Sequence, residues 1–244
     1  MRNFFIVGGQ RCGTTWLYKM LDSHPEINMA KPIKPEPKYF LNNKNASKKE
    51  YLKYHFNGID SGIVLGEKST SYYESEQAAR SIKSCLPESK IIFLVRNPIE
   101  RAISNYKFSK ANGLELRSLE DVFLNGVENE KVIANTSVNP FDYIKRGKYS
   151  NFIGKYLDIF GRDNIHIICF EQIVHSTKEF RRLLKFLDVD DTFLPSRYNK
   201  VVNSTSSPSN VSSEVRYRLK VCYEEEVSKM KKYIDTSYWH EFKE

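Results

Sequence analysis

A glycine-bearing loop near the N-terminus is the first segment whose residues could do chemistry. It reads Gly8-Gly9-Gln10-Arg11-Cys12-Gly13-Thr14-Thr15 and follows the apolar run Phe4–Val7. Backbone N–H groups at a helix start attract an anion, and glycine lets the chain approach that anion closely. The spacing is that of nucleoside-triphosphate loops, but Thr14 stands where those loops carry lysine. The pattern predicts a phosphate cradle built from backbone and Arg11, with a purely structural turn as the alternative.

A second basic segment follows the apolar run Lys90–Val95. It begins Arg96-Asn97-Pro98, and Ser104 lies eight residues after Arg96. Proline suits the first turn of a helix, so Arg96 should end a strand and Ser104 should lie inside the next helix. A guanidinium and a hydroxyl are good phosphate ligands. Because this strand ends in basic residues, where a metal-dependent site would need an acid, we expect phosphate binding without a metal.

These segments need a scaffold, and strand-like and helix-like runs alternate along the chain. The alternation predicts an α/β fold whose parallel sheet has helices on both faces, with ligands at the carboxyl ends of the strands. We expect strands at Phe4–Val7, Ile63–Leu65, Lys90–Val95 and Ile165–Phe170. The expected helices are Thr14–Ser23, Ser47–Phe56, Glu74–Leu86, Pro98–Gly113, Leu119–Asn125, Tyr149–Phe160, Lys178–Leu187 and Glu214–Tyr233. Lys31–Pro37 and Asn203–Ser213 should be loops.

Composition sets outer limits on the function. The chain has 244 residues, 40% of them hydrophobic, which predicts one globular domain over residues 1–244. A net charge of +8 suits a polyanionic partner, although solvated lysine faces would give the same value. No apolar run approaches a membrane span, so integral membrane association is not expected. The cysteines are too few and too widely spaced for a disulfide framework or zinc site, which favours a cytoplasmic protein: Cys12, Cys85, Cys169 and Cys222.

Taken together, the two basic segments resemble the signatures of sulfotransferases that use 3′-phosphoadenylyl sulfate (PAPS). The first signature is G-x-x-[KR]-[ST]-G-T-[ST], and the chain reads Gly9-Gln10-Arg11-Cys12-Gly13-Thr14-Thr15 in that loop. The second is R-[DN]-P-x-x-R-x-x-S-x-Y, which the run Arg96–Tyr106 matches. The resemblance implies a P-loop-type three-layer fold with a central, mostly parallel sheet flanked by helices.

Two further segments resemble the carbohydrate branch of that family, typified by heparan sulfate sulfotransferases. Gly66-Glu67-Lys68-Ser69-Thr70-Ser71-Tyr72 is similar to GEK[ST]P-x-Y. Glu36-Pro37-Lys38-Tyr39-Phe40 is similar to K-E-x-x-[FY]-F, with Pro35 in place of its lysine. These similarities favour a saccharide acceptor, while a lipid or a small metabolite stays open. The resemblance covers roughly residues 4–200 and implies no nucleic-acid partner; the oligomeric state stays undetermined.

The resemblance implies a role for each matching residue. Arg11 acts as an electrostatic clamp on the leaving 5′-phosphate, because arginine does not give up a proton. Lys68 neutralises the sulfuryl group and Glu36 is the base that takes the acceptor proton. The nucleotide is held, without a metal, by Gly9, Gln10, Arg11, Cys12, Gly13, Thr14, Thr15, Arg96 and Ser104. The acceptor is contacted by Lys34, Lys38 and Arg146.

Several roles stay open at this point. Glu67 is a rival base, and His24 and His55 are further candidates because the small-molecule branch of the family uses histidine. His166 and Arg101 are expected to be structural. The thiol of Cys12, beside an arginine and a helix start, is expected to have a lowered pKa. A loop at Asn199–Ser207, with Lys200 for the family's K-G pair, would cover the nucleotide.

Two other classes of function compete with sulfuryl transfer. A nucleotide kinase or GTPase would need a lysine at position 14 and a metal-binding acid, and the sequence offers neither. A glycan- or nucleic-acid-binding module would explain the positive charge but not two phosphate-binding segments in this order.

Overall fold

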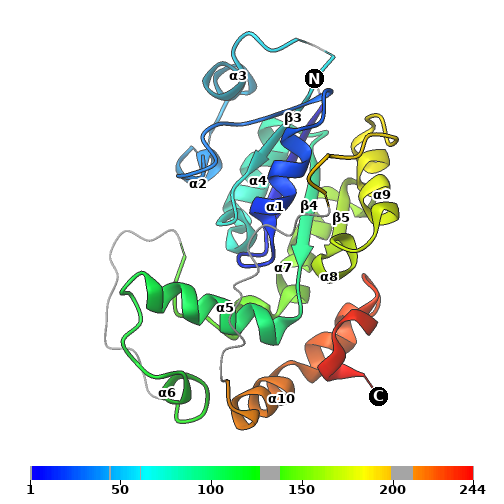
Figure 1. The fold of residues 1–244 in the computed structure, drawn as a ribbon. Helices are drawn as coiled ribbons and strands as arrows, with labels where there is room; N and C mark the ends of the chain where they lie inside the picture. The colour runs from blue at the N-terminus through cyan, green and yellow to red at the C-terminus, as the bar shows by residue number, and fades with distance from the viewer. Residues whose placement is uncertain (1, 44, 61, 127–137, 199–210, 244) are drawn as a thin grey trace.

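A computed structural model of the chain describes residues 2–43, 45–60, 62–126, 138–198 and 211–243. At its centre lies a parallel sheet of five strands in the order β2-β3-β1-β4-β5 (Figure 1). The strands are β1 (Asn3–Gly8), β2 (Ile27–Met29), β3 (Val64–Lys68), β4 (Lys90–Val95) and β5 (Ile165–Cys169). The four strands expected from the sequence are present, with bounds that agree to within three residues; the largest difference is at β3, which continues to Lys68.

The central strands are buried on both sides, which explains their nearly continuous apolar sequences. Every residue of β1 is buried, and so is every residue of β4 after Lys90. In the register of the sheet, Ile6 of β1 lies opposite Lys68 of β3 and Ile92 of β4. The carboxyl ends of β1, β3 and β4 therefore meet at one edge, and the segments that follow them are brought together there.

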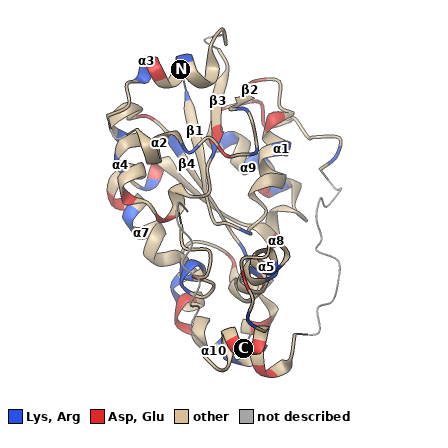
Figure 2. Ribbon diagram, turned by 90° about the vertical axis from the view of Figure 1, so that its left-hand side faces the viewer, with Lys and Arg blue, Asp and Glu red and all other residues tan. Residues whose placement is uncertain are grey.

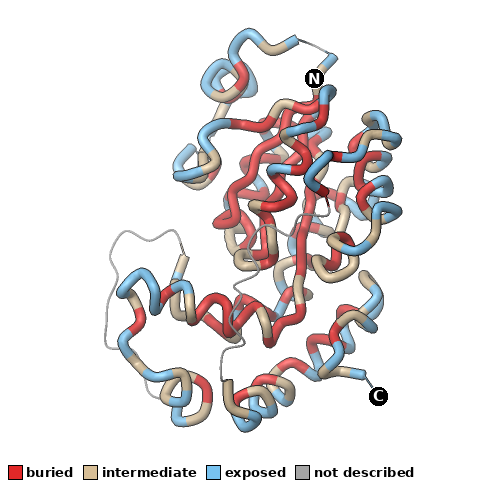
Figure 3. The backbone as a smooth tube through the Cα atoms, viewed as in Figure 1, coloured by how far each residue is buried: buried red, intermediate tan, exposed pale blue. Residues whose placement is uncertain are grey.

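Helices cover both faces of the sheet, and Figure 2 shows α4 and α7 on one face and α1 and α9 on the other. The helices are α1 (Thr14–Asp22), α2 (Tyr39–Asn42), α3 (Lys48–Phe56), α4 (Glu76–Cys85), α5 (Pro98–Ala111), α6 (Leu119–Phe123), α7 (Tyr149–Phe160), α8 (Phe170–Ile173), α9 (Thr177–Leu187) and α10 (Ser213–Met230). The expected α/β class is confirmed: a parallel sheet forms the middle of three layers, with helices on each face. Burial is concentrated in the strands, while much of α3 is exposed (Figure 3).

Helices α5 and α10 lie beyond the carboxyl ends of the strands (Figure 1). The longer, α10, packs against α5 and α7. Its inner face is formed by residues at helical spacing, among them Val215, Leu219 and Tyr223. After α10 the chain folds back so that Trp239 is fully buried. This final segment thus belongs to the packed structure around the strand ends.

Two parts of the expected organisation need comment. The sequence did not indicate β2, because three residues after His24-Pro25 are too short to show a period. The expected nucleotide-covering loop Asn199–Ser207, with Lys200, lies entirely in 199–210, outside the described residues. Most of the expected loop Asn203–Ser213 lies there too. Within the described ranges, no helix combines the length and the apolar character needed to cross a membrane.

The packing between β1, β2 and β3 generates a stability prediction at Gly66. A Cβ atom there would lie 2.3 Å from the Phe4 ring and 2.4 Å from the Met29 sulfur, inside the core. We expect Gly66→Ala to lower the free energy of unfolding by about 1–3 kcal/mol, measured by urea denaturation. Gly62→Ala is the control, because nothing lies within 4 Å of its added Cβ. Equal stability of the two variants would contradict the described packing of these strands.

Candidate active site

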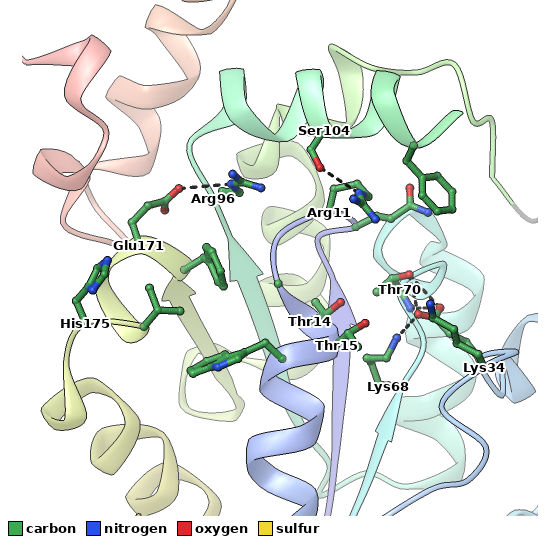
Figure 4. Close-up of a pocket in the computed structure, with 17 residues that line it drawn as sticks. Arg11, Thr14, Thr15, Lys34, Lys68, Thr70, Arg96, Ser104, Glu171 and His175 are labelled. Carbon is green, nitrogen blue, oxygen red and sulfur yellow. Dashed lines mark hydrogen bonds and ion pairs between the residues drawn. The ribbon is translucent and has the colours of Figure 1, made fainter. Parts of the chain in front are cut away.

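An open cavity of about 530 Å³ lies where the segments after β1, β3, β4 and β5 meet (Figure 4). Its walls come from the loop before α1, the segment before α2, the end of β3, helix α5 and the region of α8. Among the described residues, no cluster of three carboxylate, imidazole or thiol groups is arranged to hold a metal ion. The polar groups of the cavity are mainly cations and hydroxyls.

The start of α1 is arranged to receive an anion. Gly13 precedes the helix with a φ of 87°, a left-handed conformation that favours glycine, and no side chain caps the first turn. Gly13, Thr14 and Thr15 line the cavity. The unsatisfied N–H groups of an uncapped helix start, together with the helix dipole, suit a phosphate. A Cβ at Gly13 would also lie 2.2 Å from the Phe170 ring, so the loop packs closely against α8.

Arg11 joins the two basic segments of the sequence. Its Nε donates a hydrogen bond to Ser104 Oγ at 3.2 Å, and its guanidinium carbon lies 4.9 Å from the ring centroid of Phe108. Burial, and then the nearby charge of Arg96, lower the pKa of Arg11. The side chain nevertheless stays a cation at neutral pH. The hydroxyl and the ring hold this cation at the wall of the cavity, where it faces any bound anion.

Arg96 lies at the same cavity, held mainly through its backbone. The Tyr149 hydroxyl donates to the Arg96 carbonyl oxygen at 2.7 Å, and the Cys12 sulfur lies 3.7 Å from that hydroxyl. The guanidinium is 3.9 Å from a Glu171 oxygen and 4.0 Å from a Glu100 oxygen. Both distances are too long for hydrogen bonds, so these ion pairs leave its N–H groups able to bind an anion.

At the other side of the cavity, the end of β3 holds Glu36. The Glu36 carboxylate accepts hydrogen bonds from the Lys68 ammonium, from the Thr70 N–H at 2.8 Å and from the Thr70 hydroxyl at 2.9 Å. All three residues, and Lys34, line the cavity (Figure 4). A carboxylate has about four lone-pair positions, so three donors leave one that can face a reactant.

The rival bases lie outside the described residues that line this cavity. Glu67 is fully buried and accepts hydrogen bonds from the hydroxyls of Tyr51, Ser69 and Tyr72, at 2.9, 2.8 and 2.6 Å. Burial raises the pKa of Glu67. Its place in the core is that of a structural carboxylate that ties β3 to α3 through Tyr51.

The histidines named from the sequence also lie away from the cavity wall. His24 has both ring nitrogens in hydrogen bonds, one with the Asp190 carbonyl oxygen and one with the Glu26 N–H. His55 belongs to α3 and His166 to β5, and burial lowers the pKa of each to about 4. None of the three is among the described residues that line the cavity.

Two of the expected acceptor ligands are not brought to the cavity. Arg146 is buried, forms an ion pair with Glu74 and donates to the Gln10 side chain. This placement favours a role in holding Gln10, which does line the cavity, over direct contact with an acceptor. Lys38 precedes α2, and its backbone N–H donates to Ser69 Oγ at 2.9 Å. Its side chain is not part of the cavity wall described here.

Arg101 and Gly9 are likewise not among the described residues that line the cavity. Arg101 is fully buried and donates to Asn105 at 3.1 Å and to the Tyr143 carbonyl oxygen, which fits the structural role expected of it. Gly9 lies beneath the loop, where its N–H donates to the Leu94 carbonyl oxygen at 2.7 Å.

Sequence reasoning missed one whole wall of the cavity. Glu171, Val174 and His175 line it together with the rings of Trp16, Phe108 and Phe170. Trp16 and Phe170 meet edge to face with their ring centroids 6.3 Å apart. The first three residues follow the carboxyl end of β5. The rule that ligands bind at the carboxyl ends of parallel strands could therefore have identified this segment.

The expected low pKa of the Cys12 thiol is wrong. Cys12 is fully buried under the loop, and burial raises the pKa of its thiol to about 11. The positive charges of Arg101 and Arg96 act in the opposite direction but are outweighed. Removal from water is the larger effect because a thiolate loses its hydration there.

Cys12 should therefore resist alkylation in the native protein. A pKa of about 11 leaves about one thiol in a thousand ionised at pH 8, and the sulfur is shielded from solvent. We expect iodoacetamide to modify the half-buried Cys222 first, as measured by peptide mass spectrometry. In urea all four cysteines should react alike. Native Cys12 reacting as fast as Cys222 would contradict this placement.

Comparison with known proteins places this cavity in context. The chain is 25% identical over 232 residues to a Drosophila melanogaster bifunctional heparan sulfate N-deacetylase/N-sulfotransferase, covering 80% of this chain and 21% of that protein. It is 35% identical over 114 residues to the mouse protein of that name numbered 4, covering 45% of this chain and 13% of that one. A membrane-associated sulfotransferase, kil1, of Dictyostelium discoideum is 34% identical over 110 residues, covering 44% and 23%. The chain spans less than a quarter of the length of each.

Solved structures share the fold. A sulfotransferase from Alicyclobacillus acidocaldarius superposes with a TM-score of 0.76 at 23% identity, covering 98% of each chain. The sulfotransferase domain of the Synechococcus PCC 7002 olefin synthase gives a TM-score of 0.51 at 14% identity, covering 91% of this chain and 94% of that one. The sequence profile of the sulfotransferase domain matches residues 1–244, and the chain therefore belongs to the sulfotransferase family.

Proposed function

We propose that this sulfotransferase moves a sulfuryl group from PAPS to a hydroxyl or amine of a saccharide, giving adenosine 3′,5′-bisphosphate. The observation that carries the proposal is the meeting of Arg11, Ser104 and Arg96 at one cavity. The two cations and the hydroxyl come from separate segments. A nucleotide with phosphates at the 3′ and 5′ positions of its ribose would find a binding partner for each phosphate.

The nucleotide end of the cavity divides between the two phosphates. Arg11, Thr14, Thr15 and the uncapped start of α1 suit the 5′-phosphate and the bridging oxygen. Arg96 and Ser104 suit the 3′-phosphate, which ATP lacks. The donor set therefore fits the nucleotide that the family resemblance implies.

The transfer step needs a proton acceptor and compensation of charge. As the acceptor oxygen or nitrogen bonds to sulfur, Glu36 takes its proton, and the bond from sulfur to the bridging oxygen breaks. The electron pair stays on that oxygen, where Arg11 neutralises the developing charge. Lys68 orients Glu36 and offsets the charge on the sulfuryl oxygens. Fixed cations of this kind need no reorganisation during the reaction.

The acceptor and the cellular location are supported by separate observations. The relatives named for heparan sulfate N-sulfation favour a saccharide, and Lys34 at the cavity can attract an acidic sugar. A lipid or a small metabolite is the alternative acceptor. All four cysteines are free thiols, which supports a reducing compartment, the cytoplasm.

Nucleotide preference is the first test. We expect adenosine 3′,5′-bisphosphate to bind at least about tenfold more tightly than AMP in calorimetric titration, because charge-assisted hydrogen bonds to the 3′-phosphate are gained. Arg96→Ala should remove most of that preference. Arg80→Ala, at an exposed arginine of α4 paired with Glu76, is the matched control. A wild-type protein that does not distinguish the two nucleotides would refute the proposed function.

The role of Glu36 is tested by turnover. We expect Glu36→Gln to lower kcat by about 10²–10⁴ with labelled PAPS and a desulfated heparan sulfate oligosaccharide, because the amide cannot accept the proton. Nucleotide affinity should stay nearly unchanged. Glu50→Gln, at an exposed carboxylate of α3, serves as the control. Full turnover by Glu36→Gln would assign the proton transfer to another group of the cavity.

A further inference from the structure

The segment after α10 reaches the second basic segment of the sequence. Trp239 is fully buried, and its indole N–H donates to Glu171 at 3.1 Å. Two residues on, Glu241 accepts a hydrogen bond from the Asn97 side chain at 2.7 Å. Asn97 directly follows Arg96, so residues 239–241 contact the neighbourhood of that arginine although about 140 residues separate them in sequence.

Asn97 is fixed from three directions. Its side-chain oxygen accepts from the Ile99 N–H at 3.0 Å and so caps α5. Its backbone N–H donates to Glu171 Oε1 at 2.9 Å, and its side-chain amide donates to Glu241. The backbone that carries Arg96 is thereby held between α8, α5 and the C-terminal segment.

The C-terminal residues also hold both carboxylates that face Arg96. Glu171 Oε2 accepts from Trp239, while Glu171 Oε1 accepts from Asn97 and lies 3.9 Å from Arg96 Nε. Glu100 Oε1 accepts from Arg216 of α10 at 2.8 Å, while Glu100 Oε2 lies 4.0 Å from Arg96. The view in Figure 4 shows Glu171 and Arg96 facing one another across the cavity wall.

These contacts have an electrostatic consequence. A carboxylate free to move would approach a guanidinium to about 2.8 Å and form a bidentate pair with it. Such a pair would use the N–H groups that a phosphate needs. Here each carboxylate is directed to a donor from the C-terminal part of the chain, so Arg96 is left with two loose ion pairs.

We propose that Trp239 and Arg216 are positioning residues for nucleotide recognition: by holding Glu171 and Glu100 away from Arg96, they keep its guanidinium open to the 3′-phosphate. Glu241 supports the same arrangement, because it accepts from Asn97 and, at 3.2 Å, from Arg216. The inference rests on the proposed function, since it concerns the binding of that same nucleotide.

Two substitutions test the inference by the ratio of two affinities. Trp239→Phe keeps a buried ring but removes the indole N–H that donates to Glu171 Oε2, which leaves the Cys169 thiol as the other donor to that oxygen. Arg216→Gln releases Glu100. Each should lower the preference for adenosine 3′,5′-bisphosphate over AMP by about three- to tenfold in calorimetric titration, with AMP affinity unchanged. Partial unfolding would weaken both nucleotides equally and leave the ratio intact, so the ratio separates positioning from general stability.

A second variant shows whether the released carboxylate is the cause. In a Glu100→Gln background the competing charge is absent, so adding Arg216→Gln should not lower the ratio further. Arg218→Gln, at an exposed arginine of the same helix, is the matched control and should keep the wild-type ratio.

The outcomes are distinguishable. A wild-type protein without preference for the 3′-phosphate overturns the proposed function and this inference with it. A wild-type preference that Trp239→Phe and Arg216→Gln both retain overturns the inference alone. A loss in Arg216→Gln that persists equally in the Glu100→Gln background also overturns it, because the effect would then not pass through that carboxylate.

Discussion

The hydrogen bond between Arg11 and Ser104 is the contact on which the site depends. Arg11 belongs to the loop after β1, and Ser104 to the helix after β4. These strands are neighbours in the sheet, so their carboxyl ends deliver both segments to one edge. The sheet brings the two segments close together. The hydrogen bond to Ser104 and the contact with the Phe108 ring then orient the Arg11 guanidinium. That junction brings the groups proposed to bind phosphate to one side of the cavity.

Environment, more than residue type, divides the roles of two neighbouring carboxylates. Glu67 and Glu36 both lie near the end of β3, and both accept three hydrogen bonds. The donors to Glu67 are hydroxyls of the core, and water cannot reach it. The donors to Glu36 include the Lys68 ammonium, and Glu36 faces the cavity. One carboxylate thus organises the packing of β3, and the other is available to a reactant.

Local pattern was enough to predict the α/β class, most strands and helices, and the two basic segments that meet at the cavity, because apolar runs, glycines and Pro98 act over a few residues. What the sequence did not reveal depends on distant packing. The burial that raises the pKa of Cys12 and encloses Arg146 depends on segments distant in sequence, such as Tyr149 beside Cys12 and Gln10 beside Arg146. Glu171 and His175 form one wall of the cavity, and Glu171 accepts a hydrogen bond from Trp239. No shared sequence motif connects these residues.

The Tyr149 hydroxyl, between the Cys12 sulfur and the Arg96 carbonyl oxygen, has a thermodynamic consequence. It links the two basic segments to each other inside the core, and Arg146 links Gln10 to Glu74 in the same way. The entropy of ordering these segments is therefore lost when the protein folds, and little of it is left to lose when a nucleotide arrives. Affinity can then reflect the charges at the cavity almost directly, since the receptor is already in its binding conformation.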